Sequence, residues 1–214
     1  METIGMLGGM GSYATVEIFR RLVDAFPAEK EWERPHILID NNCTMPSRVR
    51  AILYDENRDV LVNEMKESVE WLVRRGATKI IIGCITAHHF LPELPHKDRI
   101  INAVEETVRY IPKGDVVILC TEGTIEVGIW DKALAGCNVI YPDDNQMVKL
   151  RGFIETVKKG EITAERRQEF KQFVDSFSYD TIVLGCTELP ILWNGISSKK
   201  QIIDPIQCVI DVLR

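Results

Sequence analysis

Two stretches of this chain read almost the same: Ile80-Ile81-Ile82-Gly83-Cys84-Ile85-Thr86 and Ile182-Val183-Leu184-Gly185-Cys186-Thr187-Glu188. Each copy is a short apolar run that stops at Gly-Cys, and such runs are typical of buried strands in parallel sheets. Ligands of open α/β sheets bind just beyond the carboxyl ends of these strands. We therefore expect the two cysteines to face one another across a cleft between two similar halves of the chain.

Strand and helix signals alternate outward from these two stretches. Further strands are predicted at residues 4–7, 37–39, 116–119, 139–140 and 202–203. Helices are predicted near residues 14–25, 60–75, 104–110, 124–135, 146–159 and 163–177, with a last one from residue 205. The helix over 14–25 is expected to bury one face made of Val16, Phe19, Leu22 and Val23.

This alternation predicts the α/β class. We expect two pseudo-symmetric lobes, each a mostly parallel sheet flanked by helices, with the active site in the cleft between them. The expected N-terminal lobe comprises residues 1–102 plus 207–214, and the C-terminal lobe comprises residues 103–206.

The composition excludes several functional classes. The chain has 214 residues, a net charge of -6 and no basic patch, so we expect no nucleic-acid partner. No apolar stretch reaches the roughly 20 residues that span a bilayer, and the N-terminus lacks a signal-peptide pattern, so we expect a cytoplasmic protein without a membrane partner. Its six cysteines would then stay reduced. The chain has no Cys-x-x-Cys, and the adjacent pair His88-His89 has no evident third ligand, so we expect no metal site.

Cys84 and Cys186 are the candidate catalytic residues. A free cysteine is usually a small buried hydrophobe, which is our interpretation of Cys120, Cys137 and Cys208. The two strand-end cysteines differ because a helix is expected to begin just after each, and a helix N-terminus lowers the pKa of a thiol. A thiolate on one face of a carbon and a thiol on the other can remove one proton and return another.

Hydroxyl groups gather at the predicted strand ends. Thr86, Thr121, Thr124 and Thr187 could bind a carboxylate together with free backbone N–H groups, although each one alone could be a helix N-cap. Arg48 could hold a second carboxylate through two parallel hydrogen bonds, or it could be a solvated surface residue.

The glycine cluster after the first strand offers a different interpretation. Gly9-Met10-Gly11-Ser12-Tyr13-Ala14 fits the dinucleotide-binding pattern G-x-G-x-x-A, and Asp40 at the end of the second strand could bind a ribose. This single match leaves the two Gly-Cys strands unexplained.

Taken together, these residues resemble the aspartate/glutamate racemase superfamily, and most closely its aspartate racemase branch. The resemblance rests on Ile4 to Gly11 with Ala14-Thr15, the loop from Asn41 to Arg48, Cys84 with Thr86-Ala87-His88, Thr121 with Gly123-Thr124, Gly185 to Glu188, and Asp204-Pro205. It implies a racemase that needs no cofactor, moves protons with two cysteine bases, and forms a homodimer.

The resemblance also assigns roles to residues. Cys84 and Cys186 match the catalytic cysteines, while Arg48 and Lys158 match the residues that hold the side-chain carboxylate of an acidic amino acid. The expected substrate-binding residues are Met10, Asn42, Arg48, Ile85, Thr86, Thr121, Thr124, Lys158, Thr187 and Glu188.

The chain departs from the family pattern at three positions. Ile85 replaces the usual asparagine between Cys84 and Thr86, Ser47 replaces an aspartate, and Ser12 replaces a proline. These changes bear on the substrate more than on the reaction. We expect a racemase that needs no pyridoxal phosphate and acts on aspartate first, with glutamate or a broad range of amino acids next. The alternatives are a maleate-type isomerase or decarboxylase of a dicarboxylate, a non-catalytic binding module, and a dinucleotide-binding oxidoreductase.

Overall fold

Two parallel sheets form the frame of the molecule in the computed structural model, which describes residues 2–214. The first sheet has the order β2-β1-β3, with β1 at Thr3–Gly8, β2 at His36–Asn41 and β3 at Lys79–Ile82. The second has the order β5-β4-β6-β7, with β4 at Asp115–Ile118, β5 at Asn138–Ile140, β6 at Thr181–Val183 and β7 at Gln201–Ile203. Every strand pair is parallel. The predicted α/β class with two parallel sheets is confirmed.

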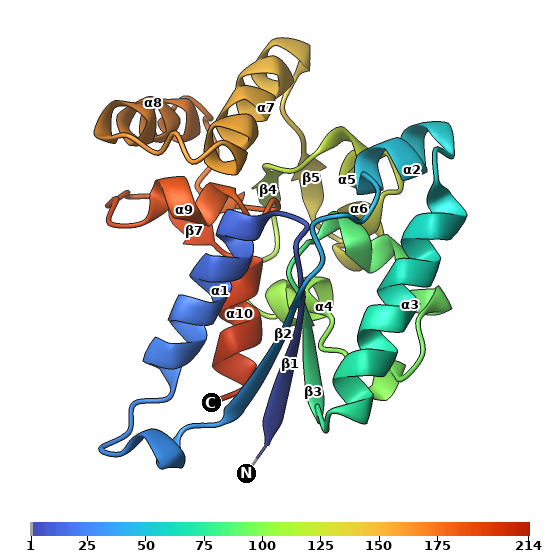
Figure 1. The fold of residues 1–214 in the computed structure, drawn as a ribbon. Coiled ribbons are helices and arrows are strands. Elements are labelled where there is room, and N and C mark those ends of the chain that lie inside the picture. Colours follow the sequence, from blue (N-terminus) through green and yellow to red (C-terminus); the bar gives the residue numbers. More distant parts are fainter. Residues whose placement is uncertain (1) are drawn as a thin grey trace.

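Helices cover both sheets and connect their strands (Figure 1). In the first half they are α1 (Ser12–Ala25), η1 (Glu31–Glu33), α2 (Arg48–Tyr54), α3 (Arg58–Arg74), η2 (Thr86–Glu93), η3 (Lys97–Arg99) and α4 (Ala103–Val108). In the second half they are α5 (Glu122–Glu126), α6 (Ile129–Ala133), α7 (Asp144–Lys158), α8 (Ala164–Asp175), α9 (Leu189–Trp193) and α10 (Pro205–Val212). The elements labelled η are 3-10 helices.

Short polar side chains set the starts of several helices. Ser47 accepts a hydrogen bond from the Arg50 N–H at the start of α2, and Thr163 caps α8 as predicted. Serine and aspartate serve equally well at an N-cap, so the serine at position 47 preserves this function. The helix predicted over 124–135 is divided into α5 and α6 because Gly128 adopts a left-handed conformation with φ of 59°.

The predicted buried face of α1 is wrong in part. The buried side chains are Ala14, Thr15, Ile18 and Leu22, whereas Val16 and Phe19 are 66% and 42% exposed. Helix α10 also packs against α1, and this contact helps to decide which side of α1 is buried.

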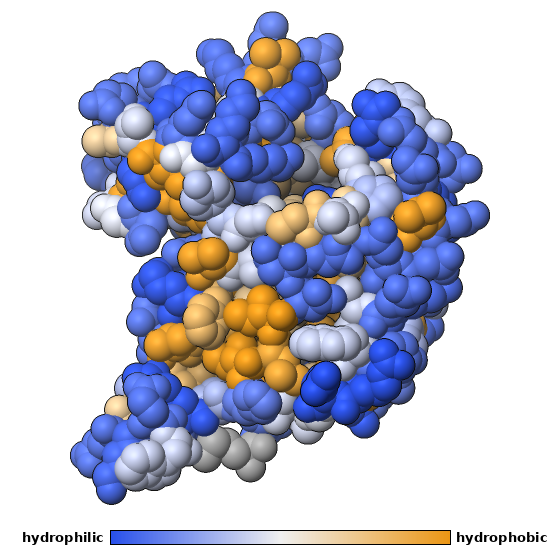
Figure 2. Space-filling model, viewed as in Figure 1, coloured by the Kyte–Doolittle hydropathy of each residue, from blue (hydrophilic) through white to orange (hydrophobic). Residues whose placement is uncertain are grey.

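The outward side of α1 carries apolar residues together with the edge strand β2. Figure 2 shows apolar residues gathered on this face of the molecule. We call Val16, Phe19, Val23, Phe26 and Ile37 the apolar patch. Val16 and Phe19 are exposed, and the other three residues line one surface groove together with Phe19. Among residues 2–214, β2 pairs only with β1, and the side chains of β2 are partly buried.

The two halves of the chain meet along α1, α4 and α10. Helix α10 packs on α4 and lies beside α1 (Figure 1). Arg21 of α1 forms an ion pair with Asp204, and both side chains are only 15% exposed. Asp204 also caps α10 by accepting from the Ile206 N–H. The exact boundaries of the two lobes stay a prediction.

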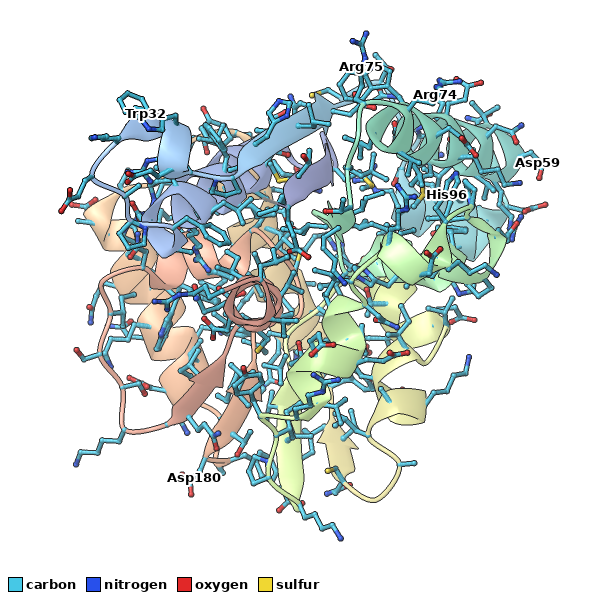
Figure 3. The ribbon with its side chains drawn as sticks, turned by 90° about the horizontal axis from the view of Figure 1, so that it is seen from below. Trp32, Asp59, Arg74, Arg75, His96 and Asp180 are labelled. Atoms are coloured by element: carbon cyan, nitrogen blue, oxygen red, sulfur yellow. The ribbon has the colours of Figure 1, made fainter. Side chains whose placement is uncertain are left out.

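Charged side chains occupy the rim of the molecule. Asp59, Arg74 and Asp180 point outward from it in the perpendicular view (Figure 3). None of the helices within residues 2–214 has both the length and the apolar character needed to cross a bilayer.

Candidate active site

The two Gly-Cys turns follow the central parts of the two sheets in the same way. Gly83 follows β3, and a Cβ at this position would lie 3.3 Å from the carbonyl oxygen of Leu7 on the neighbouring β1. Gly185 follows β6, and its Cβ would lie 3.3 Å from the carbonyl oxygen of Leu119, just after the neighbouring β4. Each glycine therefore lets the chain pass close to the adjacent strand end before it reaches the cysteine.

Cys84 and Cys186 are both buried, with 8% of each residue exposed. A negative charge on Cys84 would raise the pKa of Cys186, so the two thiols lie within electrostatic reach of each other. We expected helix starts to lower the pKa of these thiols, and for Cys186 this is wrong. Burial raises the pKa of Cys186 well above its ordinary value, and the charge and hydrogen bond of Glu188 raise it further. The following helix, α9, has only 5 residues and begins after Glu188, so the carboxylate outweighs its dipole.

Three threonine hydroxyls meet between the two halves of the chain. Thr86 Oγ1 lies 3.0 Å from Thr121 Oγ1 and 2.8 Å from Thr124 Oγ1, and the last two oxygens are 3.1 Å apart. Thr86 starts η2, whereas Thr121 and Thr124 lie at the start of α5. We call this group the hydroxyl triangle. It supplies uncharged donors from both halves at one point, as the sequence predicted for residues at strand ends.

Thr187 connects the second Gly-Cys turn to the first. Its Oγ1 donates to the carbonyl oxygen of Gly83 at 3.2 Å, across 104 positions of sequence. This bond joins the two strand ends that present the cysteines.

His88 fixes the backbone of Cys84. Its Nδ1 lies 2.9 Å from the Cys84 carbonyl oxygen, while its Nε2 accepts from the Ala103 N–H at 3.1 Å. An Nε2 that accepts carries no proton, so Nδ1 donates to the carbonyl and the imidazole is neutral. Burial lowers the pKa of His88 to about 4. The spacing of four residues from Cys84 to His88 is the only signal of this contact in the sequence, and it does not reveal Ala103.

Arg48 lies over the glycine cluster at the start of α2. Its Nη1 donates to the carbonyl of Pro46 at 3.0 Å, and its Nη2 donates to the carbonyl of Met10 at 2.8 Å. Its Nε is buried and has no hydrogen-bond partner among residues 2–214. Met10 itself is 3% exposed and takes part through this carbonyl. Arg48 thus keeps an unused donor.

Lys158, at the end of α7, and Glu188, just before α9, both interact with Cys186. Lys158 ends α7, with its Nζ 3.1 Å from Glu155 Oε1. Partial burial acts to lower the pKa of Lys158, but its bond to Glu155 and the charges of Glu188 and Cys186 raise it overall. Glu188 directly precedes α9 and is 3% exposed.

Two expected pocket residues are placed elsewhere. The Asn42 amide donates to Glu64 of α3 at 2.9 Å, and its oxygen accepts from Thr44, so its polar groups are engaged within its own loop and α3. Ile85 is 1% exposed and belongs to the apolar core with Ile81 and Trp130. The residue that replaces the family's asparagine therefore packs as a core side chain.

Protein atoms fill the space around the glycine cluster. A Cβ at Gly9 would lie 2.3 Å from the backbone of Asn42, and one at Gly11 would lie 2.4 Å from Glu188 Oε1. Asp40 accepts a hydrogen bond from Ser68 Oγ at 2.5 Å. Close approach within the protein explains these glycines, so the dinucleotide interpretation loses its support. Within residues 2–214, no group of three or more His, Cys, Asp and Glu side chains could hold a metal ion.

Comparison with known proteins identifies the family. The family described as Asp/Glu/Hydantoin racemase matches residues 7–213, and the chain therefore belongs to this family. Its relatives include the broad specificity amino-acid racemase RacX of Bacillus subtilis, which is 27% identical over 96% of this chain and 94% of the relative. The glutamate racemase of Corynebacterium diphtheriae is 30% identical, over 58% of this chain and 49% of the relative.

Solved structures agree with this placement. An aspartate racemase from Picrophilus torridus superposes with a TM-score of 0.85 and 26% identity, covering 100% of this chain and 93% of the other. An aspartate racemase homologue from Pyrococcus horikoshii shares the fold, with a TM-score of 0.74, 18% identity, and 100% and 97% coverage. The protein is an amino-acid racemase, and hence an isomerase.

The buried neutral His88 predicts a loss of stability in acid. The pKa of His88 falls from an ordinary value of 6.5 to about 4 on folding. Its contribution to the free energy of unfolding is therefore complete above pH 6.5 and is lost as the pH falls toward 4. Between about pH 7 and pH 5 this group should remove about 2 kcal/mol from the free energy of unfolding. Urea unfolding of wild type and His88→Gln at both pH values measures the difference. An equal loss in both proteins would contradict the prediction.

Proposed function

We propose that this racemase acts on an acidic amino acid, aspartate first and glutamate next, by proton transfer between Cys84, Cys186 and the α-carbon without a cofactor. The observation that carries the proposal is the pair of thiols, each presented after a glycine at equivalent strand ends and coupled by charge. One thiolate would remove the α-hydrogen, and the other thiol would donate a proton to the opposite face of the same carbon. The result is inversion without net gain or loss of protons.

The carbanion is the difficult intermediate in this mechanism. Its charge would spread into the substrate's α-carboxylate, so the site must stabilise that group more strongly as the hydrogen leaves. The hydroxyl triangle is suited to this task, because its members are bonded to one another and can turn toward an entering carboxylate. Since each cysteine is only 8% exposed, the lobes would part to admit the substrate and then exclude water.

Arg48 and Lys158 support a second carboxylate on the substrate. The unpartnered Nε of Arg48 and its neighbouring Nη2 could hold a carboxylate through two parallel bonds. Lys158 adds a positive charge close to Cys186 and Glu188.

A broader substrate range is the second candidate. Position 85, an asparagine in the family pattern, is here an isoleucine packed in the core, so this residue offers no amide to a substrate. RacX, similar over nearly the whole chain, is a broad specificity racemase.

Each cysteine should be required for inversion. Cys84→Ala and Cys186→Ala are expected to lower racemisation by at least about 10³-fold, because each removes the acid or base from one face. Each single variant should retain exchange of the α-hydrogen for one enantiomer in deuterated water. Chiral chromatography of L- and D-aspartate with mass detection measures both, and Cys137→Ala, a half-buried cysteine outside the site, is the control. Racemisation by the double variant at the wild-type rate would refute the mechanism.

Arg48 should select for the second carboxylate. Arg48→Lys removes the paired hydrogen bonds and should raise KM for aspartate about 10- to 100-fold, the effect of losing bonds to a charged group. The α-proton exchange of alanine, which has no second carboxylate, should change by less than about twofold. Steady-state exchange assays with both substrates give the ratio. An equal loss for both would show that Arg48 only supports the Met10 loop.

We also propose a homodimer, which the family resemblance implies, with the apolar patch as part of its interface. Exposed apolar patches often mark interaction sites, and this one borders an edge strand. Phe19→Asp should convert the dimer to monomer, since it places a charge in the interface. Val148→Asp, at a residue of α7 that is 63% exposed, is the matched control. Sedimentation velocity tests this, and a monomeric wild type would exclude the proposal.

A further inference from the structure

The carboxylate of Glu188 is bonded directly to one of the two cysteines. Cys186 Sγ donates to Glu188 Oε2 at 2.9 Å, and Thr187 Oγ1 lies 3.4 Å from the same oxygen. The other oxygen, Oε1, is buried and has no hydrogen-bond partner in the part of the chain that the structure describes. A carboxylate this deeply buried is costly to keep unless it interacts with a particular group.

The fold makes room for this carboxylate. Gly11, the N-cap of α1, would place a Cβ 2.4 Å from Oε1, so any side chain there would displace it. Three charged or ionisable groups interact electrostatically with Cys186, namely Glu188, Cys84 and Lys158. Glu188 is therefore held against the thiol from two sides, by α1 and by its own turn.

The other half of the site has no equivalent carboxylate. When the two Gly-Cys stretches are aligned, Thr86 occupies the place of Glu188. Its hydroxyl bonds to Thr121 and Thr124, which are uncharged. The peptide carbonyl of Cys84 is held by the neutral His88. The two thiols thus have the same position in the fold and different electrostatic surroundings.

We propose that Glu188 determines which cysteine carries the proton in the resting enzyme, keeping Cys186 as the thiol and leaving Cys84 to act as the first base. This inference rests on the proposed two-cysteine reaction and gives the site a preferred direction. The resting form would then process the enantiomer whose α-hydrogen faces Cys84.

The proton balance of one turnover follows from this arrangement. The Cys84 thiolate takes the α-hydrogen, so that its S–H bond forms as the C–H bond breaks. The S–H bond of Cys186 then breaks and its proton joins the α-carbon on the other face. The product form has a Cys186 thiolate beside the Glu188 carboxylate. These like charges repel, which favours the return of a proton from solvent to Cys186 and the loss of one from Cys84.

The first test measures the thiols without any substrate. Iodoacetamide alkylation of each cysteine, followed by peptide mass spectrometry over a pH range, reports the ionised fraction of each thiol. Glu188→Gln removes the charge and should shift the Cys186 profile to lower pH by about one to three units, while the Cys84 profile stays in place. Glu169→Gln, in a surface ion pair with Arg166, is the control. A Cys186 profile that stays unchanged or moves to higher pH would overturn the proposal.

Glu188→Thr is the second variant, in case the amide disturbs folding. It copies Thr86 of the other half of the site, and circular dichroism establishes whether either variant is folded. The same shift of the Cys186 profile is expected. Because alkylation needs no turnover, this result stands even if the wild-type enzyme racemises no acidic amino acid, an outcome that would refute only the proposed function.

The second test uses catalysis from one face at a time. Either enantiomer of threo-3-chloroaspartate can lose its α-hydrogen to one thiolate and expel chloride, and hydrolysis of the resulting enamine gives oxaloacetate and ammonia. Cys84→Ala and Cys186→Ala assign each enantiomer to its base. In wild type, kcat/KM should rise at a higher pH for the Cys186-directed enantiomer than for the other, and Glu188→Gln should shift only that rise to lower pH. Movement of both profiles together, or of neither, would show a merely structural role.

Discussion

The geometry of the site depends on two close approaches between neighbouring strand ends. Gly83 passes the carbonyl of Leu7, and Gly185 passes that of Leu119, so closely that a Cβ at either position would lie 3.3 Å from the carbonyl oxygen and crowd it. Because parallel strands end at the same edge of a sheet, each cysteine then emerges at the edge that faces the other half of the chain. The Thr187 bond to the Gly83 carbonyl connects these two turns directly.

The frame of the molecule could be predicted because it follows from local patterns. Apolar runs gave the strands, and polar caps such as Thr163 gave helix starts, since both depend on nearby residues. The buried face of α1 could not be predicted, because α10, almost two hundred residues away, helps to decide which residues turn inward. The break at Gly128 is local, and the left-handed preference of glycine was a signal that could have located it.

The site divides in the same way. Residues at strand ends, such as the hydroxyl triangle, were predictable because the sheets alone bring them together. The placement of Asn42 and Ile85 was not predictable from the sequence. The side chain of Asn42 is held by Glu64 of α3, and Ile85 packs in a core built from both halves of the chain. The contact of Glu188 with Gly11 spans most of the chain, and no local pattern encodes it.

The choice of uncharged donors in the triangle follows from what the proposed mechanism requires of the thiols. A lysine in place of Thr86 would stabilise the substrate's carboxylate, but it would also stabilise a nearby thiolate and lower the pKa of the thiol. Inversion needs one thiol to keep its proton until the carbanion forms. Hydroxyl groups stabilise the growing charge on the carboxylate through directed bonds, with a much smaller effect on thiols outside their reach. Arg48 and Lys158 carry the positive charges. The Met10 carbonyl holds Arg48, and the carboxylates of Glu155 and Glu188 offset the charge of Lys158 near Cys186.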